Sequence, residues 1–420
     1  MKWDLSEFEN KDVVFVGAGK GRAVKGVQEF LNTHTQLASF TAVDKRSDEQ
    51  PLAFLTEYDS SKTIFIKNEG VPGSELPVPY TTALQLFFRL VQMIGATTIG
   101  ITGTKGKSTT TALTAHILET AGKHVFLAGN IGNSPLLQLD DATETSIFVL
   151  ELSSYQLSDL NLSPHISACI NLFNDHTDWH GSLESYWEAK HNIMRFAGLD
   201  DVFVYNPDFP TLNEWAMSAP CKSVAINKDE SPDLLTDAAL FGEHNRLNAL
   251  IARQIARELD IDDDISLQAI HTFLPLEHRM EIVAIKNAKT YIDDAIGMTP
   301  ESTVASLLAV SNKYGPIGCL LLGGQDRNYD FTALMETIAS LNVPNLVLFP
   351  DTVEKMKNSL PVDYHPQIVE TSNMSEAVAF AAKNSPEDSV VLLSTAAPSY
   401  SLWKDFEDKG NQFKEAVRNA

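Results

Sequence analysis

Residues 97–113, TTIGITGTKGKSTTTAL, constrain the fold more than any other stretch, because an apolar strand runs into a glycine-rich turn and then into a helix. The usual nucleotide-binding loop reads G-x-x-x-x-G-K-[ST]. Ile101 stands where that pattern requires its first glycine, whereas Gly103 and Gly106 do lie in the turn. A strand, a tight turn and the positive end of a helix together favour phosphate binding. The sequence therefore predicts a phosphate-binding loop of unusual spacing.

The loop brings a cation, a hydroxyl group and a helix start together. Lys107 supplies a point charge for the phosphates, and the hydroxyl of Ser108 is placed to touch Mg²⁺. Glu151 closes the apolar strand FVLE, and an acid at the carboxyl end of a buried strand is where a nucleotide metal is usually held. The alternatives at this point are a glycine-rich turn with a chance lysine and a strand-end acid that faces solvent.

The alternation of short apolar runs and helical patterns predicts an α/β protein of three domains. Residues 1–93 are expected to form a Rossmann-like unit, residues 94–276 a central parallel sheet of the P-loop ATPase type, and residues 277–420 a second Rossmann-like unit. In the last of these, RMEIVAI (279–285) and KTYIDDA (289–295) are expected to form an antiparallel pair.

A second glycine cluster, GAGKG at 17–21, follows the first apolar strand, DVVFV. It fits G-x-G-x-G, but Arg22 stands in the last place of the dinucleotide pattern G-x-G-x-x-G. An NAD-dependent dehydrogenase is therefore the weaker alternative, and a tight strand-to-helix turn is favoured.

The chain is acidic, with a formal net charge of −23 at pH 7. Nucleic acids and anionic membrane surfaces require a basic footprint, so both are excluded as partners. The three cysteines, Cys169, Cys221 and Cys319, have neither zinc-ribbon spacing nor the density of a disulfide framework. No run has the length of a membrane span and the N-terminus does not read as a signal peptide, so a cytoplasmic protein is expected.

Further blocks, in a fixed order along the chain, carry a resemblance to a known family. They are AGNIG (128–132), VLELSSYQL (149–157), NDHTDWHGSLESYWEAK (174–190), GEHNRLNAL (242–250) and LLSTAAPSY (392–400). Together with GITGTKGKSTTT they resemble the Mur ligases over nearly the whole chain, and most closely the glutamate-adding branch of that family. The loop spacing agrees with this resemblance, because G-T-x-G-K-[ST] is the family's own form.

The resemblance implies ATP-dependent amide ligation in peptidoglycan precursor synthesis, and hence a part in cell-wall biogenesis, cell shape and cell division. Glutamate would be joined to UDP-N-acetylmuramoyl-L-alanine through an acyl phosphate, and the enzyme is expected to be a monomer. The implied cofactors are ATP and Mg²⁺ at two sites. Ser108 and Glu151 would hold one ion, and His176 the other, together with Lys190 in N-carbamylated form.

The resemblance also assigns individual residues. The implied catalytic residues are Lys107, His176, Lys190 and Asp294. The implied ATP contacts are Gly103, Thr104, Gly106, Lys107, Ser108, Thr109, Asn245, Asn248, His278 and Arg279. The implied substrate contacts are Gly17, Gly19, Asp44, Lys45, Arg46 and Gly70 for the UDP group, Asn130 and Ser153 for the muramoyl-alanine part, and Arg327, Ser399, Tyr400 and Phe406 for glutamate.

The glutamate side departs from the family pattern. The block DDAIGMT (293–299) carries Ile296 and Met298 where a lysine and a threonine are usual, and Lys105 replaces the usual asparagine of the phosphate loop. These changes resemble a branch that uses L-glutamate. D-glutamate, the commoner substrate in the family, is favoured, and L-glutamate stays the alternative.

Overall fold

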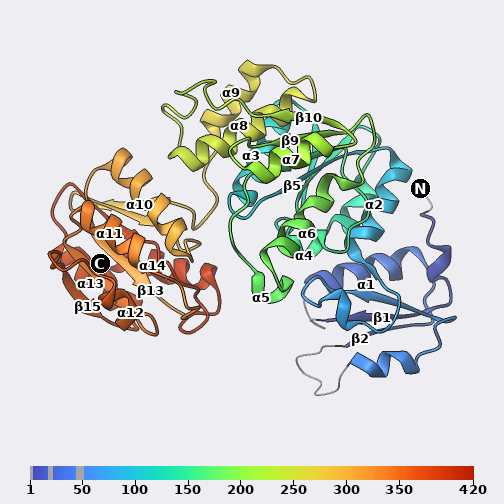
Figure 1. The fold of residues 1–420 in the computed structure, drawn as a ribbon, viewed down its shortest axis with the longest axis horizontal. Helices are drawn as coiled ribbons and strands as arrows, with labels where there is room; N and C mark the ends of the chain where they lie inside the picture. The colour runs from blue at the N-terminus through green and yellow to red at the C-terminus, as the bar shows by residue number, and fades with distance from the viewer. Residues whose placement is uncertain (1–2, 18–21, 44–51) are drawn as a thin grey trace. The chain divides into compact units, whose positions relative to one another are not determined.

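The computed structural model describes residues 3–17, 22–43 and 52–420. They form three sheets with helices packed on them, so the predicted α/β class with three domains is confirmed (Figure 1). The parallel sheets explain why the strands read as short apolar runs, since helices cover both faces of such sheets.

The chain divides into two compact units. The first unit comprises Met1–Thr236 and Leu247–His271, and it carries the first two sheets. The second unit comprises Asp237–Arg246 and Thr272–Ala420, and it carries the third sheet.

The first sheet has four parallel strands in the order β2-β1-β3-β4. Its strands are β1 (Asp12–Val16), β2 (Ser39–Val43), β3 (Thr63–Lys67) and β4 (Thr81–Thr82). Helix α1 (Arg22–His34) lies between β1 and β2 in the chain, as in a Rossmann-like unit.

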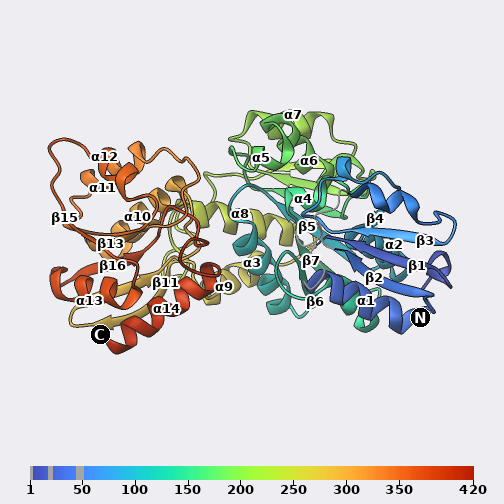
Figure 2. The ribbon, with the colours of Figure 1, turned by 90° about the horizontal axis from the view of Figure 1, so that it is seen from below.

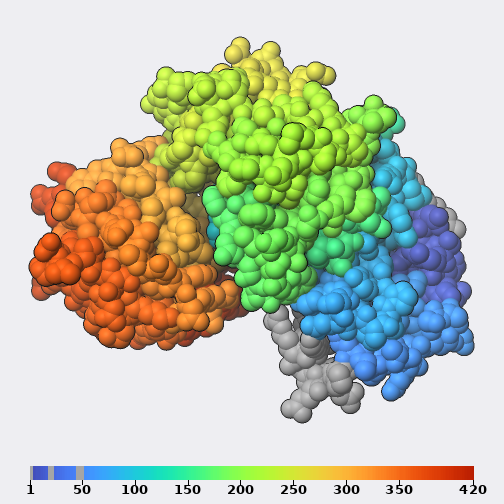
Figure 3. All heavy atoms as spheres, in the orientation of Figure 1, coloured from blue at the N-terminus to red at the C-terminus, as the bar shows by residue number. Residues whose placement is uncertain are grey.

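Helix α2 (Ala83–Ile94) joins the first sheet to the second. Thr82 caps it through a capping box with Gln85, and Gly95 ends it in the left-handed conformation, with φ 78°. The ring of Phe87 on α2 lies 5.0 Å from the ring of Phe148 in the second sheet. One hydrophobic core therefore runs through both sheets, and Figure 3 shows the blue N-terminal segment packed against the green middle segment.

The second sheet has six parallel strands in the order β10-β9-β8-β5-β7-β6. Its strands are β5 (Thr97–Thr102), β6 (His124–Gly129), β7 (Ser146–Glu151), β8 (Ile166–Cys169), β9 (Val202–Tyr205) and β10 (Lys222–Ala225). Strand β5 lies between β7 and β8, so the strand order reverses beside it. Ligands of such sheets bind at the carboxyl ends of the strands near this reversal.

The remaining helices of this part of the chain connect the strands or follow them. They are α3 (Lys107–Thr120), α4 (Ser154–Leu157), α5 (Thr177–His180), α6 (Leu183–Arg195), α7 (Pro210–Ser218), α8 (Glu243–Arg257) and α9 (Asp263–Thr272). Among the described residues, no helix combines the length and the apolar character that a membrane crossing requires.

The third sheet is mixed, with the order β11-β12-β16-β13-β14-β15. Its strands are β11 (Glu281–Lys286), β12 (Lys289–Asp293), β13 (Ile317–Gly323), β14 (Asn345–Phe349), β15 (Gln367–Glu370) and β16 (Ser389–Leu393). Strands β11 and β12 pair antiparallel, as predicted, and the other pairs are parallel.

Helices cover both faces of the third sheet (Figure 2). One face packs against α10 (Pro300–Tyr314), α11 (Thr332–Ser340) and α12 (Val353–Asn358). The other packs against α13 (Met374–Asn384) and α14 (Phe406–Asn419).

Candidate active site

The predicted phosphate loop lies between β5 and α3, at the carboxyl end of the central strand. Gly103 has φ 153° and Gly106, the N-cap of α3, has φ 85°. Only glycine adopts such values without strain, which explains why both positions carry it. A Cβ on Gly106 would lie 2.4 Å from Oδ1 of Asn248, so that predicted ATP contact adjoins the loop.

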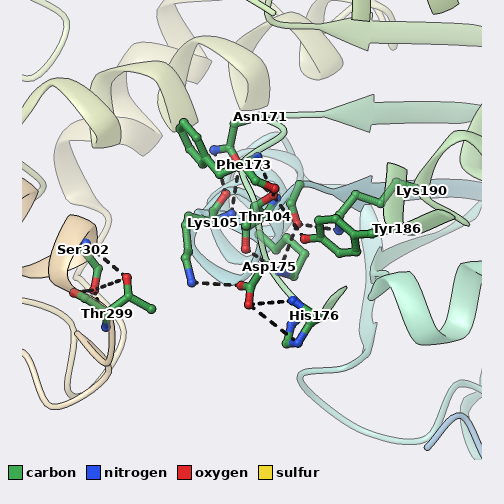
Figure 4. A network of polar contacts seen from close by, with 12 residues as sticks. Thr104, Lys105, Asn171, Phe173, Asp175, His176, Tyr186, Lys190, Thr299 and Ser302 are labelled. Carbon is green, nitrogen blue, oxygen red and sulfur yellow. Dashed lines mark hydrogen bonds and ion pairs between the residues drawn. The ribbon is translucent and has the colours of Figure 1, made fainter. Parts of the chain in front are cut away.

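Asn171 also fixes the loop backbone (Figure 4). Its Oδ1 accepts hydrogen bonds from the backbone N–H groups of Thr104 and Lys105, both at 2.9 Å, and its Nδ2 donates to the carbonyl oxygen of Lys105 at 3.0 Å. Tyr186 donates from its hydroxyl to Oγ1 of Thr104 at 3.1 Å. The sequence motifs assign no role to Asn171 or Tyr186.

Lys107 begins α3 and turns back over the loop. Its Nζ donates to the carbonyl oxygens of Gly103 at 3.1 Å and Thr104 at 3.0 Å. Ser108 and Thr109 follow on the first turn and are buried. The loop thus presents an ammonium group and the start of a helix at one place, which suits an anion.

Lys190 on α6 is buried beneath the same loop, with 1% of its surface exposed. Its Nζ donates to the carbonyl oxygen of Gly103 at 2.8 Å and lies 4.8 Å from the ring centre of Tyr186. No carboxylate of the described residues forms an ion pair with it. Burial, and then the nearby charge of Lys107, lower the pKa of Lys190 well below its usual value.

Glu151 ends β7 and pairs in register with Ile101 of β5. It is 2% exposed. Its Oε1 accepts a hydrogen bond from Nδ2 of Asn130 at 3.1 Å, whereas its Oε2 is buried with no hydrogen-bond partner among the described residues. A buried carboxylate oxygen without a donor is costly unless a further group, such as a cation, binds it.

His176 stands at the start of α5 (Thr177–His180), in the left-handed conformation with φ 51°. Its Nδ1 lies 2.8 Å from the hydroxyl of Tyr155. Burial lowers the pKa of His176 below 6.5, and the charges of Lys107, Lys190 and Lys105 act in the same direction, against Asp175. The histidine is therefore neutral near pH 7, the form that can bind a metal ion.

The structure thus brings Lys107, His176 and Lys190 together at the end of the central sheet, with Glu151 on the strand beside the loop. Thr104 belongs to the same loop, and Ser108 to the first turn of α3 that follows it. These predicted residues all lie in the first compact unit.

The predicted acceptor residues are only partly described. Gly19, Asp44, Lys45 and Arg46 lie outside the described residues. Gly17 directly follows β1 and has φ 105°.

The carbonyl oxygen of Gly70 accepts a hydrogen bond from Nε1 of Trp179 at 3.3 Å. Beside it, Gln156 donates to Oε1 of Glu69 at 3.0 Å and forms the capping box of α4 with Ser153. The Gly70 loop therefore contacts the same α4–α5 region that carries Ser153 and His176.

In the second unit, Asp294 follows β12 and is 4% exposed. Its Oδ2 accepts hydrogen bonds from the hydroxyls of Ser306 at 2.7 Å and Ser394 at 2.8 Å. Lys409 on α14 is fully buried, and its Nζ donates to Oγ1 of Thr395. Burial lowers the pKa of Lys409 to about 7, although Asp294 opposes the shift. The motif reasoning had given Lys409 no role.

His278 forms a buried pair with Asp293, with 2.6 Å between Nδ1 and Oδ2. Glu281 lies close enough that the three side chains could hold a metal ion. Gly410 packs on them so closely that a Cβ there would lie 2.1 Å from Nδ1 of His278. The backbone N–H of His278 donates to Oε2 of Glu281 at 3.0 Å, and Nζ of Lys414 lies 2.8 Å from the same oxygen, so the cluster is a polar network beside Arg279.

The predicted glutamate residues differ in exposure. Ser399 is fully buried, and its hydroxyl has no hydrogen-bond partner among the described residues. Tyr400 is 60% exposed. Arg327 is exposed, with its Nε 3.4 Å from Oε1 of Gln325. The ring of Phe406 lies 6.2 Å from that of His278.

The last predicted ATP contact, Asn245, is 5% exposed. Its Nδ2 donates to the carbonyl oxygen of Phe241 at 2.9 Å. Both residues belong to the second unit, whereas Asn248 belongs to the first.

Asp294→Asn should change the pH dependence of stability. Burial raises the pKa of Asp294 to about 6 against 3.8, although Ser306 and Ser394 oppose the shift. At Asp294 the folded protein therefore binds more protons than the unfolded chain between pH 4 and 6, so the contribution of this group to the free energy of unfolding should fall by about 2 to 3 kcal/mol as pH rises through this window. The asparagine variant should lack this fall, because it has no proton to lose.

Urea unfolding of both proteins at pH 4, 5, 6 and 7 measures this difference. We expect the variant to gain stability relative to the wild type towards pH 7. A difference in free energy that stays constant from pH 4 to 7 would contradict the expectation.

Comparison with known proteins places the chain in one family. Residues 101–239 match the Mur ligase middle domain. A UDP-N-acetylmuramoylalanine–D-glutamate ligase of Bacillus cereus (strain G9842) is 31% identical over 98% of this chain and 98% of its own length. One of the same name from Natranaerobius thermophilus is 29% identical over 98% of this chain and 94% of its own length.

Solved structures have the same fold. The MurF ligase of Thermotoga maritima in complex with ADP aligns with a TM-score of 0.63 and 16% identity, over 99% of this chain and 97% of that chain. The UDP-N-acetylmuramate–alanine ligase MurC of Thermotoga maritima aligns with a TM-score of 0.63 and 18% identity, over 97% of this chain and 99% of that chain.

Proposed function

The chain belongs to the Mur ligase family, and on this premise we propose how its residues carry out the reaction. It is an ATP-dependent ligase that adds D-glutamate to UDP-N-acetylmuramoyl-L-alanine in peptidoglycan precursor synthesis. The near full-length match to D-glutamate ligases carries this conclusion. It favours D-glutamate over the L-glutamate alternative and replaces the dehydrogenase interpretation of residues 17–21.

The phosphate loop is the proposed site for ATP. The backbone from Gly103 to Thr109 would surround the phosphates, with the positive end of α3 directed at them. Lys107 would exchange its bonds to the loop carbonyls for contacts with the phosphates. Asn245, Asn248, His278 and Arg279 are the proposed contacts for the rest of the nucleotide.

Most of the proposed donors around the loop are oxygen atoms, which Mg²⁺ prefers, and the ring nitrogen of His176 is the exception. The free Oε2 of Glu151 and the hydroxyl of Ser108 would hold one ion. His176 and a carbamylated Lys190 would hold the second. When bound, Mg²⁺ would neutralise negative charge on the phosphoryl group that is transferred.

Burial supports the modification of Lys190. Only the neutral amine attacks CO₂, and burial, which lowers the pKa of this lysine, favours that form. The amine and CO₂ give a carbamate with release of one proton. An uncompensated buried ammonium becomes an oxygen ligand in this way, which removes the cost of an unpaired buried cation.

The reaction needs activation, because a free carboxylate has no good leaving group. An oxygen of the alanine carboxylate attacks the terminal phosphorus of ATP, and ADP leaves. The neutral amine of glutamate then attacks the carbonyl carbon of the acyl phosphate. The bond from that carbon to the phosphate oxygen breaks, and phosphate leaves with the proton that the nitrogen loses as the amide forms. Lys107 would stabilise the charge that moves with the phosphoryl group. Water must be excluded, since it would hydrolyse the acyl phosphate.

The second unit is proposed to bind glutamate. The buried hydroxyl of Ser399 lacks a partner among the described residues, and a substrate carboxylate could accept its hydrogen bond. Arg327, Tyr400 and Phe406 would complete the pocket. Asp294 would take part in catalysis from the end of β12.

The acceptor is proposed to bind to the first unit. Gly17, Gly19, Asp44, Lys45, Arg46 and Gly70 are the proposed contacts for the UDP group, and Asn130 and Ser153 those for the muramoyl-alanine part. The contact between the Gly70 loop and α4–α5 supports this, because it joins the first sheet to the region of His176. The proposed domain limits are 1–93, 94–276 and 277–420, and a monomer is proposed.

An assay with both glutamate enantiomers tests the function. With ATP, Mg²⁺ and UDP-N-acetylmuramoyl-L-alanine, we expect phosphate release to depend on D-glutamate and to be much slower with L-glutamate. The physical reason is that a chiral pocket can pair only one arrangement of the amine and two carboxylates, and an unpaired buried polar group is costly. Faster release with L-glutamate would overturn the choice of enantiomer, and no release with either would overturn the ligase function.

A further inference from the structure

A second lysine, Lys105, lies in the phosphate loop between Gly103 and Gly106. Asn171 holds its backbone through both the N–H and the carbonyl group. The starting point of the Lys105 side chain is therefore fixed, although the side chain itself is 43% exposed.

The ammonium group of Lys105 is paired with one carboxylate. Its Nζ lies 3.2 Å from Oδ2 of Asp175, whose side chain is 24% exposed. The other oxygen of Asp175 accepts a hydrogen bond from the backbone N–H of His176 at 3.0 Å. Burial opposes the shift, but Lys105 and His176 hold the pKa of Asp175 below its usual value. The side chain of Lys105 therefore lies on the side of the loop that faces His176 (Figure 4).

Lys105 differs from the other two lysines of the site in the charge of its partner. Lys107 and Lys190 donate to backbone carbonyl oxygens of the loop, which are neutral acceptors. Lys105 contacts a full negative charge. A part-exposed ion pair contributes little to stability, so exchanging Asp175 for a more highly charged anion costs little. Phosphate oxygens are such an anion, and a lysine binds them as a point charge.

We propose that Lys105 is a second phosphate-binding cation. Its ammonium group moves away from Asp175 and contacts the terminal phosphate of ATP, and it pairs with Asp175 again when only ADP remains. The proposal rests on the ATP-dependent function argued above. The first turn of α3 would serve the phosphates that ATP and ADP share, and Lys107 would reach the phosphoryl group that is transferred. Lys105 lies beside His176, where that phosphoryl group is expected. Lys105 therefore distinguishes ATP from ADP.

Nucleotide binding to the whole enzyme tests this proposal without the reaction. Isothermal titration with Mg²⁺ would compare ADP with a non-hydrolysable ATP analogue. Lys105→Met should weaken binding of the analogue about tenfold, as expected for the loss of one charge-assisted contact, and should change ADP binding less than about threefold. Lys105→Arg should restore most of the difference. The control Lys222→Met removes a lysine of the same domain that pairs with Glu258 at 2.7 Å, and it should leave both affinities unchanged.

A further variant separates phosphate binding from a purely structural ion pair. Asp175→Asn breaks the same pair but leaves Lys105 free, so binding of the analogue should be kept or strengthened. If Asp175→Asn and Lys105→Met weaken both nucleotides equally, the assignment of Lys105 is overturned. An unchanged ratio of ADP to analogue affinity in Lys105→Met also overturns it. A wild-type protein that binds neither nucleotide would instead overturn the ATP-dependent function, and the assignment with it.

Discussion

Lys107→Met will reduce ATP-dependent phosphate release at least about 10³-fold, the range seen when a cation that stabilises phosphoryl transfer is removed. The Nζ of Lys107 is held over the loop by the carbonyl oxygens of Gly103 and Thr104. Methionine keeps much of the length and volume of the side chain but removes its charge. The initial rate of phosphate release at saturating substrates measures the effect.

The matched control is Lys228→Met. Lys228 lies in the same compact unit and pairs with Asp208 on the surface, so the same chemical change there should leave the rate unchanged. Far-ultraviolet circular dichroism should show that both variants are folded. A folded Lys107→Met protein with more than about a tenth of the wild-type rate would exclude this lysine from the transfer step.

Lys190→Ala will reduce activity about 10²-fold or more, because it removes the proposed ligand of the second metal site. Lys190 is almost completely buried, so the alanine variant leaves a space beneath the loop. Short carboxylates such as acetate should enter that space and replace the missing carbamate oxygens. Activity should therefore rise with added acetate and saturate, whereas the wild-type rate should not rise.

Lys67→Ala is the control for the general effect of removing a buried lysine. Lys67 is equally buried but is paired with Asp159 at 2.8 Å. Its loss should destabilise the protein, and acetate should not restore activity. A second measurement follows the carbamate itself, since removal of CO₂ from the buffer should lower wild-type activity reversibly. Full activity of Lys190→Ala would remove this lysine from the mechanism.

The sequence predicted the fold and the position of the glycine-rich loop where a local pattern determines both. The loop glycines, Lys107 and Glu151 follow from the end of a strand and the start of a helix, and these are short-range features. The antiparallel pair β11–β12 was predicted correctly for the same reason, because its two strands are consecutive in the chain.

The rest of the site depends on contacts between distant parts of the chain. Asn171 hydrogen-bonds to the backbone of Lys105, which lies 66 positions earlier in the chain, and no spacing rule connects the two residues. Lys409 reads as an ordinary helix lysine, and its complete burial follows only from the packing of α14 on the third sheet. The resemblance, rather than any pattern of charge, selected Lys190 and Asp294.

The position of Ile101 shows what sets the geometry of the phosphate turn. Its side chain is buried inside β5, where its backbone pairs with both β7 and β8, and the strand continues to Thr102. The phosphate turn therefore begins only after Thr102, where β5 ends, and it is shorter than the turn of the common loop. A sequence search that requires the common pattern G-x-x-x-x-G-K-[ST] would miss this chain. A scan for a strand end, a left-handed glycine and a following lysine would retrieve it, along with any unrelated enzyme built on the same shortened bend.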